Sequence, residues 1–99
     1  SQAARAAPPG NPGSWVTNAD YPSASIRAEE QGTTGFRLSV GADGRVADCQ
    51  ITSSSGSSRL DQTACQMLRR RARFTPARDA AGNPTTSVYT SSVRWQIPE

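Results

Sequence analysis

Few residues of this chain could carry out covalent or metal chemistry. The 99 residues include no His, and Cys49 and Cys65 lack both the partners of a zinc cluster and the close spacing of a redox CxxC motif. The run Thr52–Ser58 is rich in hydroxyl groups, but without a neighbouring base such groups are typical of loops and helix caps. We therefore predict that the protein is not an enzyme and binds neither a metal nor another cofactor.

The two cysteines point instead to a structural role. A core this small often needs a covalent supplement, and a disulfide between Cys49 and Cys65 would close a loop of about 16 residues, worth roughly 3 kcal/mol in the chain-entropy model. Such a bond would place the protein in an oxidising compartment, such as a periplasm or an extracellular space. Two free thiols are the alternative, and we consider the disulfide the stronger interpretation.

An arginine cluster suggests a second kind of chemistry. All 11 basic residues are Arg, and the formal net charge is +3. Arg clusters can neutralise phosphates, so the alternative function of this chain is to bind a polyanion, either nucleic acid or an envelope glycan. The small excess of charge and the scarcity of interleaved aromatic residues argue against nucleic acid. The cluster consists of Arg69, Arg70, Arg71 and Arg73.

The helices and strands that must position these residues are expected only after the first 14 residues. Residues 1–14 are rich in Ala, Pro and Gly and are typical of a linker, whereas residues 15–99 would form one domain. Pro22 and Gly32 stand at a suitable first helical position and C-terminal stop, which predicts a short helix between them. Because no apolar run approaches the roughly 20 residues that cross a bilayer, we expect either a soluble protein or an excised domain.

A hairpin follows the short helix. Residues from Phe36 to Val40 alternate between apolar and polar, as in a half-buried strand. Asp43-Gly44 would supply the tight turn, because Gly tolerates the positive φ of primed turns. The return strand would run over residues 45–53. Its core-facing residues would be Ala47, Cys49 and Ile51.

A longer amphipathic helix comes next. Ser58 and Asp61 have the spacing of a capping box and would begin the helix, and Pro76 would end it. At 100° per residue Cys65 lies at the rim of an apolar stripe. Arg71 falls on the apolar side, where we expect its stem to lie on the core edge and its guanidinium to stay in water. The stripe consists of Leu60, Ala64, Leu68 and Ala72, with Met67 beside Leu60.

The last element is a strand, which follows a turn-rich loop over residues 79–84. The order helix, strand, strand, helix, strand predicts an α+β fold with two helices on one face of a three-stranded antiparallel sheet. If all neighbours are antiparallel, the last strand pairs with the first and has an open edge. That edge is either protected by polar groups such as Arg94 or is a docking surface for another extended chain. The side chains expected to face the helices are Tyr89, Ser91, Val93, Trp95 and Ile97.

Taken in order, these motifs resemble the C-terminal domain of TonB-family energy transducers. The resemblance covers about residues 15–98, and the ordered set is more specific than any one motif. The pair Cys49 and Cys65 also resembles a pair found in many bacterial branches of the family. The motifs are Asp20-Tyr21-Pro22, Gly35, Asp43-Gly44-Arg45-Val46, Ser54-Ser55-Gly56 with Leu60-Asp61, Ala72-Arg73-Phe74-Thr75-Pro76-Ala77, Gly82-Asn83-Pro84 and Val93-Arg94-Trp95-Gln96-Ile97-Pro98.

The resemblance implies a periplasmic domain that is anchored to the inner membrane by an N-terminal helix and a Pro-rich spacer, which this chain does not include. Its partners would be TonB-dependent outer-membrane receptors, whose TonB box adds as a strand to the edge of the last strand. The motor proteins ExbB and ExbD would supply force through the N-terminal region for nutrient uptake. The resemblance implies no small-molecule substrate.

Carried over to this sequence, the peptide-contacting positions fall in two segments, one before the first helix and one in the last strand. The strand would contribute mainly backbone groups, because strand addition gains its affinity from ladder hydrogen bonds. Core packing is the competing interpretation for Trp15 and Trp95, and Tyr21 could equally staple the first helix. The candidate residues are Asn18, Ala19, Asp20, Tyr21, Pro22, Val88, Tyr89, Thr90, Ser91, Ser92, Val93, Arg94, Trp95 and Gln96.

Overall fold

The structure, a computed structural model, describes residues 15–97. The linker predicted for residues 1–14 lies outside the described residues. The predicted α+β class, with two helices and a three-stranded antiparallel sheet, is confirmed. In chain order the elements are the 3-10 helix η2 (Asn18–Asp20), α1 (Ser23–Arg27), β1 (Gly32–Val40), β2 (Val46–Ser53), α2 (Ser58–Arg71), β3 (Ala77–Arg78), β4 (Pro84–Thr85) and β5 (Ser87–Trp95).

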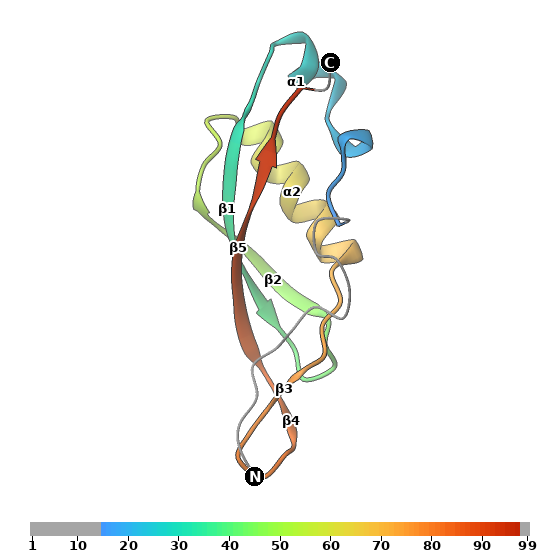
Figure 1. Ribbon diagram of the computed structural model, residues 1–99, viewed down its shortest axis with the longest axis vertical. Coiled ribbons are helices and arrows are strands. Elements are labelled where there is room, and N and C mark those ends of the chain that lie inside the picture. Colours follow the sequence, from blue (N-terminus) through green and yellow to red (C-terminus); the bar gives the residue numbers. More distant parts are fainter. Residues whose placement is uncertain (1–14, 98–99) are drawn as a thin grey trace.

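The sheet has the strand order β2-β1-β5, as the sequence predicts, with β1 at its centre. Both neighbours run antiparallel to β1, and β1 and β5 pair along their whole length (Figure 1). Phe36 pairs with Ser91 on one side and with Ile51 on the other. Because β1 has a partner on each side, the open edges of the sheet belong to β2 and β5.

The hairpin between β1 and β2 turns at Gly44, as predicted. Gly44 has φ 82, and its amide donates to the Gly41 carbonyl at 2.9 Å. The turn also serves a distant contact, because the amide of Phe74 donates to the Gly44 carbonyl at 2.9 Å. A Cβ at Gly44 would lie 2.2 Å from the Phe74 carbonyl oxygen. Glycine is therefore required here both by the positive φ and by the close approach of the chain.

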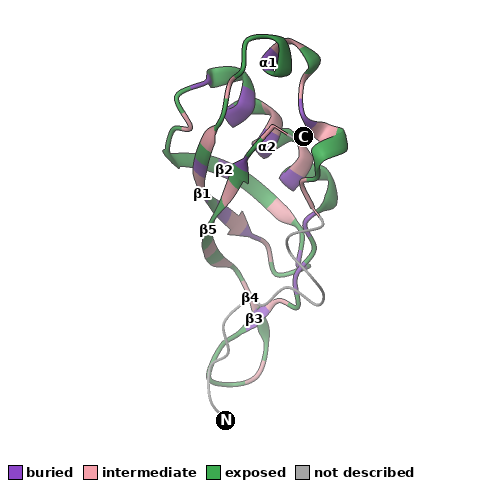
Figure 2. Ribbon diagram, turned by 45° about the horizontal axis from the view of Figure 1, so that its top comes forward, coloured by how far each residue is buried: buried purple, intermediate pink, exposed green. Residues whose placement is uncertain are grey.

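One face of the sheet packs under α2, which lies mainly over β2 and β1 and meets β5 at its Trp95 end. The predicted stripe on α2 is confirmed, and its two halves belong to different buried clusters. Leu68 and Ala72 cluster with residues of β1, whereas Leu60 and Ala64 cluster with Tyr21 and Trp95. Figure 2 shows α2 buried on the side that faces the sheet and exposed on the other. The smaller helix α1 lies beyond the end of the sheet (Figure 1). The buried residues of the stripe are Leu60, Ala64, Leu68 and Ala72.

The expected core face of β2 is wrong at Ala47, which is exposed. The register between β1 and β2 shifts at this point, where Ser39 pairs with Asp48 and Val40 pairs with Val46. Ala47 is therefore the extra residue of a β-bulge, which reverses the alternation of side chains. Cys49 is buried as expected, whereas Ile51 is 39% exposed at the sheet edge.

The boundaries of α2 differ from the prediction at both ends. Its N-cap is Ser57, whose hydroxyl accepts a hydrogen bond from the Leu60 amide at 3.3 Å, so the predicted cap at Ser58 is one residue late. The helix ends at Arg71, well before Pro76. It ends early because the following residues pair with the hairpin, where Arg73 forms a bridge with Arg45.

The first helix is shorter than predicted. Pro22 is the N-cap of α1 rather than its first residue, and Glu29 follows the helix with φ 56. Gly32 does not stop a helix but begins β1. A Cβ at Gly32 would lie 2.3 Å from the Ser55 carbonyl oxygen, so the close packing of another loop explains this glycine.

A two-stranded ribbon that the sequence did not predict precedes β5. Strand β3 pairs with β4, and Ala77 lies opposite Thr85. The expected turn between them is present, and the Asp79 carboxylate accepts hydrogen bonds from the amides of Ala81 at 2.9 Å and Asn83 at 3.0 Å. Two residues per strand give too little alternation to be detected in a sequence.

A disulfide joins β2 to α2. Cys49 and Cys65 are bonded, with their Cα atoms 5.7 Å apart, which confirms the favoured of the two sequence interpretations. Cys49 belongs to the buried cluster under α2, and Cys65 packs against that cluster at its rim. The bond therefore attaches the covering helix to an edge strand of the sheet.

We expect replacement of both cysteines, in the variant Cys49→Ala/Cys65→Ala, to lower the free energy of unfolding by about 3 kcal/mol. The chain-entropy model gives this magnitude for the 16-residue separation between the two cysteines. Chemical denaturation followed by circular dichroism measures it. Wild-type protein treated with reductant is the control and should lose the same stability, whereas an equal stability of the oxidised and reduced forms would contradict the prediction.

Candidate functional site

The outer edge of β5 is the first component of the candidate site. Every residue of β5 pairs with β1, from Ser87 opposite Val40 to Trp95 opposite Gly32. Within residues 15–97 no strand pairs with the other edge of β5. Alternate residues of an edge strand direct their N–H and C=O groups away from the sheet. This edge can therefore extend its ladder of hydrogen bonds to another extended chain.

The side chains of β5 alternate between two different environments, as predicted, except at Ser91, which is exposed although it was expected to face the helices. On the face toward α2, Trp95 is buried and Tyr89 and Val93 are half-buried. On the opposite face Val88 is 58% exposed. Ser91 is the one small residue between Tyr89 and Val93 in the row that faces α2. The other residues of the exposed face are Thr90, Ser92 and Arg94.

Trp95 and Tyr21 anchor the end of β5 in a second buried cluster. Trp95 is 3% exposed, and its ring meets that of Tyr21 edge to face, with the centroids 5.2 Å apart. The Tyr21 hydroxyl donates to the Glu30 carbonyl. Burial, with a contribution from the nearby Glu30 charge, raises the pKa of Tyr21. Core packing is thus the role of the Trp95 side chain, and two candidate peptide-contacting residues pack against each other.

Asp61 organises a buried polar network behind this anchor. Its carboxylate accepts hydrogen bonds from the hydroxyls of Thr34 at 2.8 Å, Ser54 at 2.5 Å and Ser55 at 2.8 Å, and from the Ser55 amide at 3.0 Å. Trp95 Nε1 in turn donates to the Thr34 hydroxyl at 3.2 Å. Burial acts to raise the pKa of Asp61, but these hydrogen bonds outweigh it and lower the pKa below its ordinary value.

Asp61 is not the helix-capping acid that the sequence predicts. The helix begins one residue earlier than predicted, and the carboxylate turns inward instead of reaching the N-cap. The useful signal was the hydroxyl-rich run before it, since a buried carboxylate needs several donors.

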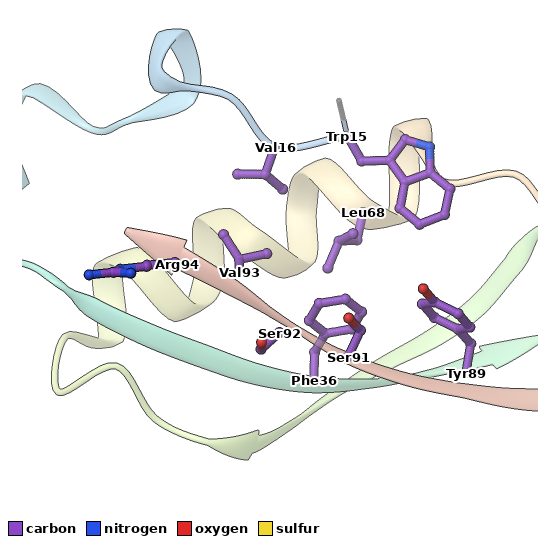
Figure 3. Close-up of a pocket in the computed structure, with 9 residues that line it drawn as sticks. All are labelled: Trp15, Val16, Phe36, Leu68, Tyr89, Ser91, Ser92, Val93 and Arg94. Atoms are coloured by element: carbon purple, nitrogen blue, oxygen red, sulfur yellow. The ribbon is translucent and has the colours of Figure 1, made fainter. Parts of the chain in front are cut away.

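A pocket of about 190 Å³ opens beside β5. It exists because α2 lies mainly over β2 and β1 and meets β5 at Trp95, so that the rest of the inner face of β5 is covered only in part, by the segment that contains Trp15 and Val16. Figure 3 shows these two side chains on one side of the pocket and Phe36 and Leu68 at its base. The residues lining it are Trp15, Val16, Phe36, Leu68, Tyr89, Ser91, Ser92, Val93 and Arg94.

Trp15 contributes both to the edge of the core and to the wall of the pocket. It is half-buried, and its ring lies 5.3 Å from that of Phe74, which in turn lies 5.0 Å from Tyr89. Trp15 therefore packs at the edge of the core, as one interpretation of the sequence held, and its ring also forms part of the pocket wall.

An ion pair fixes the segment before α1 to the end of α2. Arg71 donates to both oxygens of Asp20, at 2.6 and 2.9 Å, and to the Trp15 carbonyl at 3.2 Å. The hydrogen bond from Arg71 is the main reason why the pKa of Asp20 is lowered. The Arg71 side chain remains 43% exposed, as expected. In addition, the tertiary fold brings to its guanidinium a carboxylate and a carbonyl that are far away in the sequence.

The structure brings only part of the predicted peptide-contacting set together. The segment 18–22 approaches the Trp95 end of β5 through Tyr21, whereas Asn18 and Ala19 are exposed and Pro22 is half-buried. Val88 lies toward the opposite end of the strand, and Gln96 is exposed just beyond β5. Trp15, Val16 and Phe36 were not among the predicted contacts, although they line the pocket with β5.

The arginine cluster is largely engaged within the domain. Besides the pair of Arg71 with Asp20, Arg69 lies 3.3 Å from Asp48, and Arg73 donates to the Ala72 carbonyl at 2.8 Å. A surface that binds phosphates needs guanidinium groups free to contact them. These contacts weaken the polyanion alternative.

Across residues 15–97, no three His, Cys, Asp or Glu side chains are grouped so that they could hold a metal ion. No helix in the same range is long and apolar enough to cross a membrane.

The fold and the site define a small α+β module whose last strand has an open edge beside an apolar pocket. The family of Gram-negative bacterial TonB protein C-terminal domains matches residues 17–97, which is most of the chain. The chain therefore belongs to this family, whose members are periplasmic parts of non-enzymatic transducers. No curated individual protein matches the chain significantly.

We expect the Asp20→Asn variant to be less stable than wild type at pH 7, with the difference shrinking as the pH falls below about 4. The folded-state pKa of Asp20 is lowered from 3.8, so the folded protein favours the charged carboxylate. That stabilisation is present above the unfolded-state pKa and is lost as the pH falls through the folded-state pKa. Urea denaturation between pH 7 and pH 3 measures it. Glu29→Gln, at an exposed acid, is the control, and a difference independent of pH would refute the prediction.

We expect Asp61→Ala to lower the free energy of unfolding by about 3 kcal/mol, because it leaves the buried hydroxyl of Thr34 and the partly buried hydroxyl and amide of Ser55 without their acceptor. The near-ultraviolet circular dichroism of Trp95 should change as well, since its partner Thr34 loses the carboxylate. The matched control is Asp48→Ala, which removes an exposed pair with Arg69 and should cost less than about 1 kcal/mol. Equal losses in the two variants would show that the buried network does not stabilise the fold.

Proposed function

We propose that this chain is the receptor-binding domain of a TonB-like energy transducer. It captures the TonB box of an outer-membrane receptor by strand addition at the free edge of β5. The observation that carries the proposal is this edge, which is open over the nine residues of β5 and lies beside an apolar pocket. Family membership supports interaction with outer-membrane receptors in general.

The affinity of such a complex comes mainly from backbone hydrogen bonds, which require only that the receptor segment be extended. The paired strand β1 and the anchored Trp95 hold β5 in place before the segment arrives. A rigid edge reduces the entropy lost on binding. Side chains that flank the edge then select among extended segments.

Force from the inner membrane enters the domain through the chain that precedes Trp15. In this proposal an N-terminal membrane helix and the motor proteins ExbB and ExbD lie upstream of the domain. The ion pair between Asp20 and Arg71 joins the entering segment to α2, and the disulfide joins α2 to the sheet. A pull at Trp15 is thereby distributed to the sheet that holds the receptor segment.

We expect a synthetic TonB-box peptide to shift the backbone amide signals of residues 88–96 and those around Tyr21 in an NMR titration of the isotope-labelled domain. The affected amides should be those at and near the free edge, because strand addition forms new hydrogen bonds there. A scrambled peptide and an oligonucleotide are the controls.

Shifts confined to residues 69–73 and caused only by the oligonucleotide would replace the proposal with polyanion binding. If neither ligand moves any signal, receptor capture by this domain is rejected. Equal shifts with the motif and scrambled peptides would indicate that the β5 edge pairs with any extended peptide, without recognition of the receptor sequence.

A further inference from the structure

The pocket beside β5 has the size and lining of a site for a single apolar side chain. Its volume of about 190 Å³ is below the range of about 300–1,000 Å³ typical of small-molecule sites. It exceeds the roughly 150 Å³ of an engineered apolar cavity that accepts benzene. The rings of Trp15, Phe36 and Tyr89 and the aliphatic groups of Val93 and Leu68 supply an apolar lining.

Ser91 makes the pocket reachable from the free edge. In the row of β5 that faces α2, it is the small residue between Tyr89 and Val93, and it pairs with Phe36 on β1. A larger residue at this position would fill the space above the Phe36 ring. Figure 3 shows Ser91 on β5 beside the Phe36 ring.

A strand added to β5 would point every second side chain toward the same face as Ser91. The residue directly opposite Ser91 would have its Cβ about 5 Å from that of Ser91 and could enter the pocket. Its two sequence neighbours would point to the exposed face, beside Thr90 and Ser92. Only one position of the added strand can therefore be buried deeply here.

We propose that this pocket receives one apolar side chain of the captured receptor segment, opposite Ser91, and that this position sets the specificity and register of the segment. The inference rests on the proposed function, because it needs a strand on the β5 edge. The wall formed by Trp15 and Val16 is held in place by the contact of Arg71 with Asp20 and the Trp15 carbonyl.

The continuity of the pocket with the free edge favours a receptor segment over the other occupants. Residues 1–14 of this chain contain Ala and Pro but no Val, Leu, Ile, Met or aromatic residue, so they offer no side chain large enough to fill the space. A second copy of the chain could pair through β5, and the test below distinguishes this occupant from a receptor segment.

The test compares Ser91→Leu, which fills the pocket from β5, with Thr90→Leu, which adds the same side chain on the opposite face of the same strand. Each apolar residue of a synthetic TonB-box peptide is replaced by Ala in turn, and binding to the disulfide-bonded domain is measured by isothermal titration. For wild type we expect one replacement to weaken binding by about ten- to a hundredfold, and the others by much less. Thr90→Leu should keep this sensitivity and Ser91→Leu should lose it.

Ser91→Val is a smaller alternative if Ser91→Leu does not fold, and thermal unfolding of every variant checks the fold. If wild type binds the peptide but no single apolar residue matters more than the others, or if both leucine variants behave alike, the pocket is not a specificity site although receptor capture stands. If wild type binds no peptide, both proposals fail. Dimerisation of wild type that Ser91→Leu abolishes and Thr90→Leu preserves would assign the pocket to a second copy and overturn the inference.

Discussion

The packing of α2 against the central strand β1 is the constraint on which the rest of the structure depends. Leu38 of β1 and Leu68 of α2, which belong to the same buried cluster, are 0% and 1% exposed. A helix of 14 residues is only about 21 Å long and covers a limited area. Because α2 lies mainly over β2 and β1 and meets β5 at Trp95, the middle of the inner face of β5 is covered only in part, by the segment around Trp15. The candidate site is thus a consequence of how one helix covers three strands.

Two carboxylates add polar contacts that connect the parts of the site. Asp61 connects α2, through Thr34, to the indole of Trp95 at the end of β5. Asp20 binds Arg71 and so fixes the segment that forms the outer wall of the pocket. Both have lowered pKa values because hydrogen bonds favour their charged forms. The two links differ in setting, since Asp61 is buried whereas the Arg71 side chain is 43% exposed.

Local patterns predicted the elements well and their ends poorly. The stripe on α2, the turn at Gly44 and the alternation in β5 were readable because side-chain period and turn geometry depend on nearby residues. The bulge at Ala47, the early end of α2 at Arg71 and the β3–β4 ribbon were not readable. Each arises where one segment pairs with another distant in the sequence, and such pairing overrides local preference.

The sequence by itself determined the fold class, the strand order and the open edge of β5, because alternation, helical period and connection direction leave few ways to arrange so short a chain. Its motifs also indicated the family. Only the tertiary structure decided that a pocket opens over Ser91, that Arg71 binds Asp20 and that Trp95 joins the network of Asp61. These contacts connect residues up to 61 positions apart, and no local pattern encodes which distant side chains will meet once the core has packed.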